Sequence, residues 1–411
     1  MRESAALTRL EIILLICFSL VGGVTQLAWY GKNPNGGIGG ESIALATSLA
    51  ERGTFADPFM HTGATGASAH VTPLFPLALA VVFRLFGPAS KFVLLALSLL
   101  GSGLNAGLLP FVSRRLLDSA APGFLAAAVV VILPVYEIWP SWDSIYSADL
   151  IMAGVVVFLS RYGNSPWVAG SMIGILFLLN PVAGVVMLIF AAWILSGRKR
   201  APRFFVSSAA MFAVILLPWI VRNYREFHRF IPLRDDLGIA LYSSNNPCAQ
   251  ATLVENMDSG CHAKTHPNDS IAENRLVTRL GEVEYNKVRL HSAWQWIAGN
   301  PGSFARLTGE RFLYFWAPVG SPAVWSISLS GFAGLILLFK RDPRTAKMFA
   351  TALAAGSFIY YFIEGQARYR FPVYWCVCLC GGYFVVSLVK AGGSFRPLVA
   401  SNVASSSKTF E

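Results

Sequence analysis

Residues 39–87 read GGESIALATSLAERGTFADPFMHTGATGASAHVTPLFPLALAVVFRLFG, and this stretch decides how the rest of the chain is arranged. It follows the first membrane-length apolar run, and its own apolar end, Pro73 to Phe86, has only 14 residues. A helix of that length covers about 21 Å, whereas the hydrocarbon core of a bilayer is about 30 Å thick. We therefore predict a re-entrant or interfacial helix here, not a membrane span.

The composition is that of a membrane protein. The chain has 411 residues, of which 55% are hydrophobic and 13% charged, and a soluble domain carries about twice that charge. The sequence therefore predicts an all-α polytopic membrane protein, a bundle of about 10 transmembrane helices with a long first outer loop. Apolar runs that span or nearly span a bilayer lie at 10–29, 91–112, 123–139, 145–160, 204–221, 323–339, 346–363 and 371–389, with a divided run at 167–195.

The net charge of +11 comes largely from basic clusters in short loops, which mark a cytoplasmic face and do not point to nucleic acid. These clusters share one face only if residues 73–86 do not cross and if the run at 167–195 is two short helices broken at Asn180 and Pro181. With these assignments the chain crosses the membrane an even number of times, so both termini are predicted to lie in the cytoplasm. The basic residues are Arg114, Arg115, Arg161, Arg198, Lys199, Arg200, Arg203, Lys340, Arg341, Arg344 and Lys347.

The chain reads as one transmembrane domain over residues 1–390, followed by a mobile, Ser-containing cytoplasmic tail over 391–411. Its two long outer segments are the first loop, at about 30–90, and a larger region at 222–321. Within the larger region, Tyr285 to Trp296 has the pattern of an amphipathic surface helix that ends before Pro301.

The cysteines divide by position. Cys248 and Cys261 lie 13 residues apart in the outer region, where an oxidising compartment favours a disulfide, and two free thiols are the alternative. Cys376, Cys378 and Cys380 lie in the last apolar run without a nearby histidine. Because this spacing does not place them on one helix face, we expect apolar packing and no zinc site.

Acidic residues gather at the predicted outer surface. Glu41 follows two glycines in the first turn of a helix, where the helix dipole favours the ionised carboxylate. It is our candidate general base for a hydroxyl nucleophile, and a helix-start acid without a catalytic role is the alternative. Asp149 lies one turn inside a span, where ionisable groups are functional candidates, and Asp143 lies in the turn before it. Asp57 and His70 of the first loop are candidate substrate-binding residues.

Three arginines lie where the chain meets the outer membrane surface, against the positive-inside bias: Arg222, Arg368 and Arg370. A guanidinium group binds phosphate through two parallel hydrogen bonds, and Tyr369 adds a hydroxyl donor. We therefore predict a phosphate site, with anchoring to ordinary lipid phosphates as the alternative. No zinc motif occurs, and His262 and His266 are a weak signal, so the identity of any metal stays unknown.

Several motifs, in their order along the chain, resemble those of the GT-C glycosyltransferases, and the nearest branch is glycosyltransferase family 39 with its bacterial relatives. These motifs are the first-loop acid followed by xAxxLAxxGxF, AHVTPLFPLALAVVFRLFG at 69–87, LLNP at 178–181, PWIVRN at 218–223 and ARYRFPV at 367–373. The resemblance covers about residues 10–390.

The resemblance implies transfer of a sugar from a polyprenyl-phosphate carrier to an acceptor on the outer face, usually with inversion. Glu41 takes the place of the first-loop acid, where relatives more often have Asp, and the second acid maps to Asp143 or Asp149. Asn223, in PWIVRN, joins the substrate-binding candidates.

The sequence therefore predicts a glycosyltransferase of the bacterial inner membrane that acts on a lipid, glycan or protein acceptor. A divalent metal is compatible with this function, and no other cofactor is expected. The main alternative is a transporter or lipid flippase, which would have pseudo-repeated halves and a midplane site. A membrane scaffold without catalysis is the third interpretation.

Overall fold

The computed structural model describes residues 9–32, 40–59, 62–132, 143–159, 165–196 and 201–404. Within these ranges the chain is helical, and its extended pairing is limited to the isolated bridges Ala56–Ala67 and Thr252–Gly365. The predicted all-α fold is confirmed. Four of the basic residues that mark the predicted cytoplasmic face lie outside the described residues, namely Arg161, Arg198, Lys199 and Arg200.

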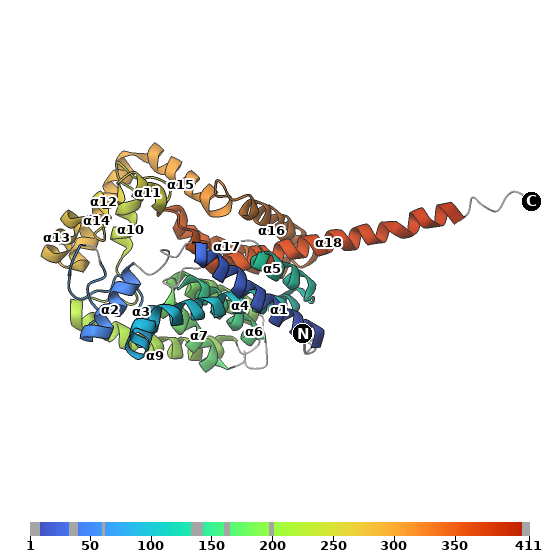
Figure 1. The fold of residues 1–411 in the computed structure, drawn as a ribbon, viewed down its shortest axis with the longest axis horizontal. Helices are drawn as coiled ribbons and strands as arrows, with labels where there is room; N and C mark the ends of the chain where they lie inside the picture. Colours follow the sequence, from blue (N-terminus) through green and yellow to red (C-terminus); the bar gives the residue numbers. More distant parts are fainter. Residues whose placement is uncertain are drawn as a thin grey trace, which may run out of the picture.

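Long apolar helices form the body of the molecule (Figure 1). Four described stretches are long and apolar enough to cross a membrane, namely Leu74–Leu117, Pro202–Phe227, Pro322–Arg341 and Ala367–Ala391. The helices of the body are α1 (Arg9–Lys32), α4 (Ser90–Leu117), α5 (Ala121–Ile132), α6 (Ser144–Leu159), α7 (Pro166–Leu179), α8 (Pro181–Leu195), α9 (Ala201–Phe227), α16 (Pro322–Arg341), α17 (Pro343–Phe358) and α18 (Phe371–Ala404).

The first of those stretches contains two helices and not one. Helix α3 (Leu74–Phe86) has 13 residues and ends at Gly87, whose φ of 47° is a conformation that glycine adopts without strain. A short 3₁₀ turn then leads into α4. Phe75 and Leu79 of α3 pack with Ile43 of α2 (Glu41–Arg52) and with Leu94 of α4. The predicted short helix is therefore confirmed, and it packs against α2 and α4.

The predicted break at Asn180 and Pro181 is also confirmed. The Asn180 side-chain oxygen accepts hydrogen bonds from the backbone N–H groups of Val182 and Ala183, which caps α8. Helices α7 and α8 are therefore two separate, short helices that contact each other. Figure 1 shows that α1 begins, and α18 ends, away from the helices of residues 222–321.

The outer region is built from short helices: α10 (Leu237–Ser244), α11 (Leu253–Asp258), α12 (His262–Thr265), α13 (Ile271–Leu280), α14 (Glu282–Gly299) and α15 (Pro301–Trp316). Helix α14 contains the predicted amphipathic segment and stops before Pro301. Cys248 and Cys261 form the predicted disulfide. At the other end of the chain, α18 runs on to Ala404, past the predicted start of the tail, and this end projects away from the other helices (Figure 1).

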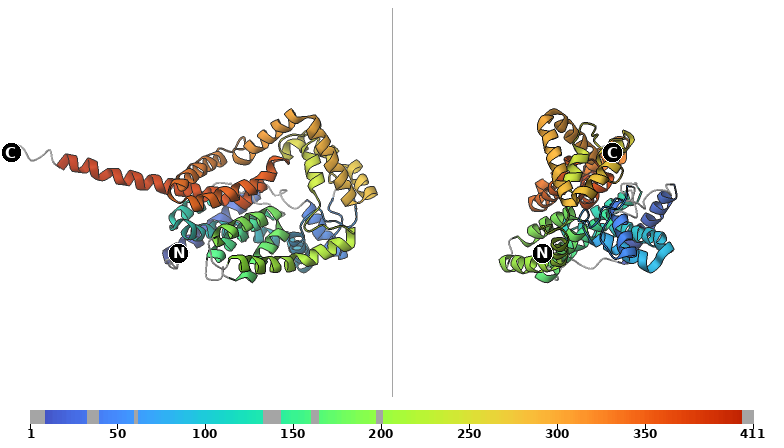
Figure 2. Two further views of the ribbon diagram at one scale, coloured as in Figure 1. Left: turned by 180° about the vertical axis from the view of Figure 1, so that it is seen from behind. Right: turned by 90° about the vertical axis from the view of Figure 1, so that its left-hand side faces the viewer.

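The two halves of the chain form two layers. Figure 2 shows the C-terminal half, yellow to red, lying over the N-terminal half, blue to green, in both views. The first outer loop joins them, because Phe59 packs against Ile239, Val277 and Tyr285 of the outer region. A site shared by the first loop and the outer region therefore lies where the two halves meet.

Candidate active site

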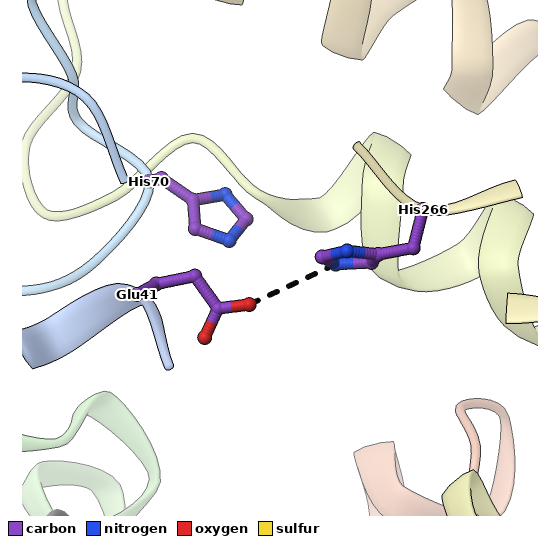
Figure 3. Close-up of side chains that lie close together, drawn as sticks. All are labelled: Glu41, His70 and His266. Atoms are coloured by element: carbon purple, nitrogen blue, oxygen red, sulfur yellow. Dashed lines mark ion pairs between the residues drawn. The ribbon is translucent and has the colours of Figure 1, made fainter. Parts of the chain in front are cut away.

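Glu41, His70 and His266 come together between the two halves (Figure 3). The His266 Nε2 atom lies 4.0 Å from Glu41 Oε1. One ligand atom from each of the three residues lies within 4.8 Å of the other two. These residues come from three separate segments, namely the first turn of α2, the loop before α3 and the end of α12.

Local structure explains how each of the three is presented. Gly40, at φ 93°, turns the chain into α2, and the buried Ile43 and Leu45 anchor the helix that carries Glu41 in its first turn. His70 is 7% exposed and lies edge-on to the Phe59 ring. His266 also lies edge-on to Phe59, at 6.0 Å between ring centroids. One phenyl ring therefore supports both imidazoles.

His266 is held by its own neighbours. The His262 ring stacks on it at 4.5 Å, and His262 Nδ1 lies 2.6 Å from an Asp269 carboxylate oxygen. The backbone N–H of Asn268 donates to His266 Nδ1 at 3.2 Å. An accepting Nδ1 places the ring proton of neutral His266 on Nε2, the atom that faces Glu41. The resting arrangement therefore presents an N–H group to the carboxylate.

The protonation states follow from burial and charge. Burial lowers the pKa of His266 to about 3, against the attraction of Glu41, and burial likewise lowers the pKa of His70. Burial acts to raise the pKa of Glu41, but His266, His70 and Arg368 act in the opposite direction, and its pKa lies below the ordinary value. At neutral pH the site therefore holds a carboxylate and two neutral imidazoles.

This donor set suits a divalent cation. Zinc is commonly bound in tetrahedral geometry by imidazole nitrogens and carboxylate oxygens at about 2.0–2.2 Å, so two ligand atoms of one ion lie about 3.4 Å apart. The ligand atoms of the three side chains, which lie within 4.8 Å of one another, have to approach by up to about 1.4 Å to reach that geometry. His266 also has to give up its bond from Asn268, because Nε2 needs a free electron pair to bind a metal.

A second acid lies beside this cluster. Asp143, just before α6, accepts a hydrogen bond from Asn180 Nδ2 at 3.0 Å, so the break between α7 and α8 positions it. Its carboxylate acts electrostatically on Arg234 and Arg368. Arg234 is paired with Asp236 at 3.0 Å. Burial acts to lower the pKa of Arg234, but Asp236 raises it above the ordinary value, so its guanidinium stays charged.

Arg368 and Tyr369 lie on the same side of the cluster. The Tyr369 ring stacks on Tyr360 at 4.1 Å, and the Arg368 guanidinium lies over the Tyr369 ring. Arg368 Nε donates to the side chain of Gln366. The charge of Arg368 acts to lower the pKa of Glu41, so Arg368 and Tyr369 belong to the same site as Glu41. Two cations, Arg234 and Arg368, thus accompany two acids, Glu41 and Asp143.

The other two predicted phosphate ligands are used within the fold. Arg370 is 6% exposed and donates to the backbone oxygen of Tyr314. Arg222 donates to the backbone oxygens of Ser68 and Phe55, so it ties the first loop to α9. Its neighbour Asn223 is fully buried and donates to the Ile231 oxygen. Arg222 and Arg370, which depart from the positive-inside bias, therefore have partners within the fold, and their assignment to substrate stays a prediction.

The surroundings of Asp57 and Asp149 also come from the fold itself, and their roles stay predictions. The Asp57 carboxylate accepts the N–H groups of Thr65 and Gly66 and pairs with Arg52, which closes the loop on itself. Asp149 is 7% exposed between α6 and α4, beside Gly101 and Asn105. Asp143, and not Asp149, is the acid that faces the arginines. Asp149 follows Asp143 by six residues, which places it about 9 Å further along the helix axis.

Sequence reasoning missed His266 as a principal residue, and it missed Arg234 and Glu364 altogether. Glu364 is 8% exposed, accepts a hydrogen bond from Asn256, and lies within the field of Glu41 and His262. A signal for Arg234 was present, because Arg-Asp-Asp at 234–236 follows closely after the chain leaves the membrane. No local pattern joins residue 266 to residue 41.

The fold and the position of the site together define a class. This is a helical, polytopic membrane protein whose ionisable site lies where the first loop meets the region 222–321. No family model and no curated protein matches the chain. Among solved structures, the fold is similar to that of an Archaeoglobus fulgidus oligosaccharyltransferase in complex with Zn and sulfate, with a TM-score of 0.54 and 16% identity. The match covers 96% of this chain and 51% of the archaeal one, so the chain spans about half of that protein's length.

Proposed function

We propose that the protein is a membrane glycosyltransferase, related to family 39, that moves a sugar from a polyprenyl-phosphate donor to a hydroxyl acceptor at the outer face of the inner membrane. The observation that carries this proposal is the ionised Glu41, held beside Asp143 and two arginines where the membrane helices meet the outer region. An acidic residue can take the proton of the nucleophile, and cationic groups can stabilise the charge on a phosphate leaving group.

The donor phosphate binds to Arg368, Tyr369 and Arg234 in this proposal. As the sugar–phosphate bond breaks, negative charge grows on the leaving phosphate, so the two guanidinium groups stabilise the transition state more than the bound donor. Arg234 replaces Arg370 of the sequence prediction, because the Arg370 side chain donates to Tyr314. The stacked Tyr360 and Tyr369 rings hold this face of the site in place.

Glu41 acts on the acceptor. Its carboxylate takes the proton of the acceptor hydroxyl as that oxygen bonds to the sugar, with inversion at the anomeric carbon, and the Nε2–H of His266 orients the carboxylate. A divalent ion at Glu41, His70 and His266 would supply Lewis-acid activation of the same hydroxyl. The Zn in the archaeal oligosaccharyltransferase structure supports that second arrangement.

The test is transfer of labelled sugar from a polyprenyl-phosphate donor by purified parent protein and by Glu41→Gln. Gln keeps the shape but is not a base, so transfer should fall by about 10²–10⁴-fold. Glu51→Gln is the control, since Glu51 lies on the exposed last turn of the same helix. Transfer by Glu41→Gln at the parent rate would show that Glu41 is not the general base. Transfer is also measured with added Zn²⁺ and with a chelator. Its rate should change with these additions only if a metal ion, and not the Glu41 carboxylate alone, activates the acceptor hydroxyl.

The alternative of a transporter or flippase gains no specific observation from the described residues. Flipping of a labelled polyprenyl-phosphate lipid in vesicles, with no product formed, would favour it.

A further inference from the structure

The segment Ser68 to His70 is held by a buried carboxyl group of the outer region. Glu282, at the start of α14, is 4% exposed. Its Oε2 accepts the Ser68 hydroxyl at 2.6 Å, and its Oε1 accepts the Ala69 N–H at 2.6 Å. The Ser68 hydroxyl oxygen in turn accepts the backbone N–H of His70 at 3.0 Å. Two consecutive hydrogen bonds therefore connect Glu282 to the backbone of His70.

The same segment has further contacts from two other elements. Arg222 of α9 donates to the Ser68 backbone oxygen. The N–H of Asp235 donates to the Ala69 oxygen at 2.8 Å, and Asn286, one turn along α14, donates to the Asp235 oxygen. The charged and titratable groups facing Glu282 are thus Arg222 and Asp235. Of the residues in this network, only His70 belongs to the candidate active site, and it enters the network through its backbone N–H.

Burial sets the charge of this network. It raises the pKa of Glu282 to about 8, with a further contribution from Asp235, while the bonds from Ser68 and Ala69 and the charge of Arg222 act to lower it. Burial and Asp236 raise the pKa of Asp235 to about 6. At neutral pH, Glu282 is therefore mainly a neutral carboxyl group that still makes both bonds.

We propose that Glu282 is a positioning residue that fixes Ser68–His70 against the outer region, so that His70 faces Glu41 in a pH-dependent manner. The importance of this position for catalysis rests on the proposed function, whereas the attachment of the segment does not. A carboxyl group with a raised folded-state pKa stabilises the attached segment fully below about pH 4.5. That contribution is lost as the pH rises to about 8 and is constant above it.

Amide hydrogen exchange of the full-length protein in detergent measures this attachment directly, because the Ala69 and His70 amides are themselves bonded. After correction for exchange of an unprotected peptide, protection at these two amides should fall by up to about tenfold per pH unit between pH 5 and 8 and then level off. Glu282→Gln should remove most of that slope. Glu284→Gln is the matched control, because Glu284 lies in the same turn of α14 with its side chain 48% exposed.

Carbethoxylation read by mass spectrometry then tests the position of His70. In Glu282→Ala, His70 should react at least about tenfold faster than in the parent, since its attachment is lost. The exposed His228 serves as the internal reference. A parent slope that persists in Glu282→Gln, or unchanged His70 reactivity in Glu282→Ala, would overturn the proposal. Absence of sugar transfer in the parent would instead refute the proposed function and leave the exchange result standing.

Discussion

The disulfide between Cys248 and Cys261 should stabilise the turn that carries His266. Cys261 immediately precedes α12, and His266 immediately follows it. The two cysteines are separated by 13 positions, and closing a loop of that size restricts the unfolded chain by about 3 kcal/mol in the chain-entropy model. That energy corresponds to about a 150-fold change in the equilibrium between folded and unfolded outer region.

The perturbation is the double variant Cys248→Ser, Cys261→Ser, compared with Cys17→Ser, which removes an exposed thiol of α1. Denaturant unfolding followed by tryptophan fluorescence should show the double variant less stable by about 3 kcal/mol and the control within about 0.5 kcal/mol of the parent. In the parent, Cys248 and Cys261 should resist alkylation until a reductant is added.

The consequence for the site is measured separately, by thermal stabilisation on adding Zn²⁺. If α12 is loosened, His266 no longer faces Glu41 in most molecules, and the shift with Zn²⁺ should shrink in the double variant. Equal unfolding free energies for parent and double variant, or alkylation of these cysteines without reductant, would refute the reasoning.

Three further results are expected. Arg368→Lys keeps the charge but loses the pair of parallel N–H donors, so transfer should fall by about one to three orders of magnitude in the labelled-sugar assay. An unchanged rate would mean that Arg368 does not bind the donor phosphate. Asp143→Asn should lower transfer by at least about tenfold, whereas Asp149→Asn should stay within about twofold of the parent, because only Asp143 faces the arginines. The reverse order of effects would make Asp149 the second acid of the site. Reporter tags near Pro88 and after Arg115 should read outside and cytoplasmic, and a cytoplasmic signal near Pro88 would mean that α3 crosses the membrane.

Much of the fold could be predicted from local sequence. The shortness of α3 follows from counting apolar residues before Gly87, and the α7–α8 break follows from Asn180 and Pro181, whose capping and missing N–H act within one turn. The first-turn position of Glu41 likewise depends only on its neighbours. These features are decided by residues close together in the chain, so a sequence pattern carries them.

The candidate site could be predicted only in part. Glu41, Asp143, His70 and Arg368 were among the candidates, but the sequence alone did not separate Asp143 from Asp149. It also treated Arg222 and Arg370 as ligands, because an arginine at the outer surface looks the same whether it binds phosphate or a backbone carbonyl. Which partner an arginine has depends on segments that lie far away in the chain, such as residues 55 and 68 for Arg222.

The sequence by itself determined a helical membrane protein and predicted which of its segments face outward, since hydropathy and charge act on each segment separately. Only the tertiary structure brought His266 to Glu41, and Glu282 to the Ser68–Ala69 backbone. These pairs are separated by more than two hundred positions. Their meeting depends on how the C-terminal half packs over the first loop, through contacts such as Phe59 with Tyr285, and that packing is a property of many residues together.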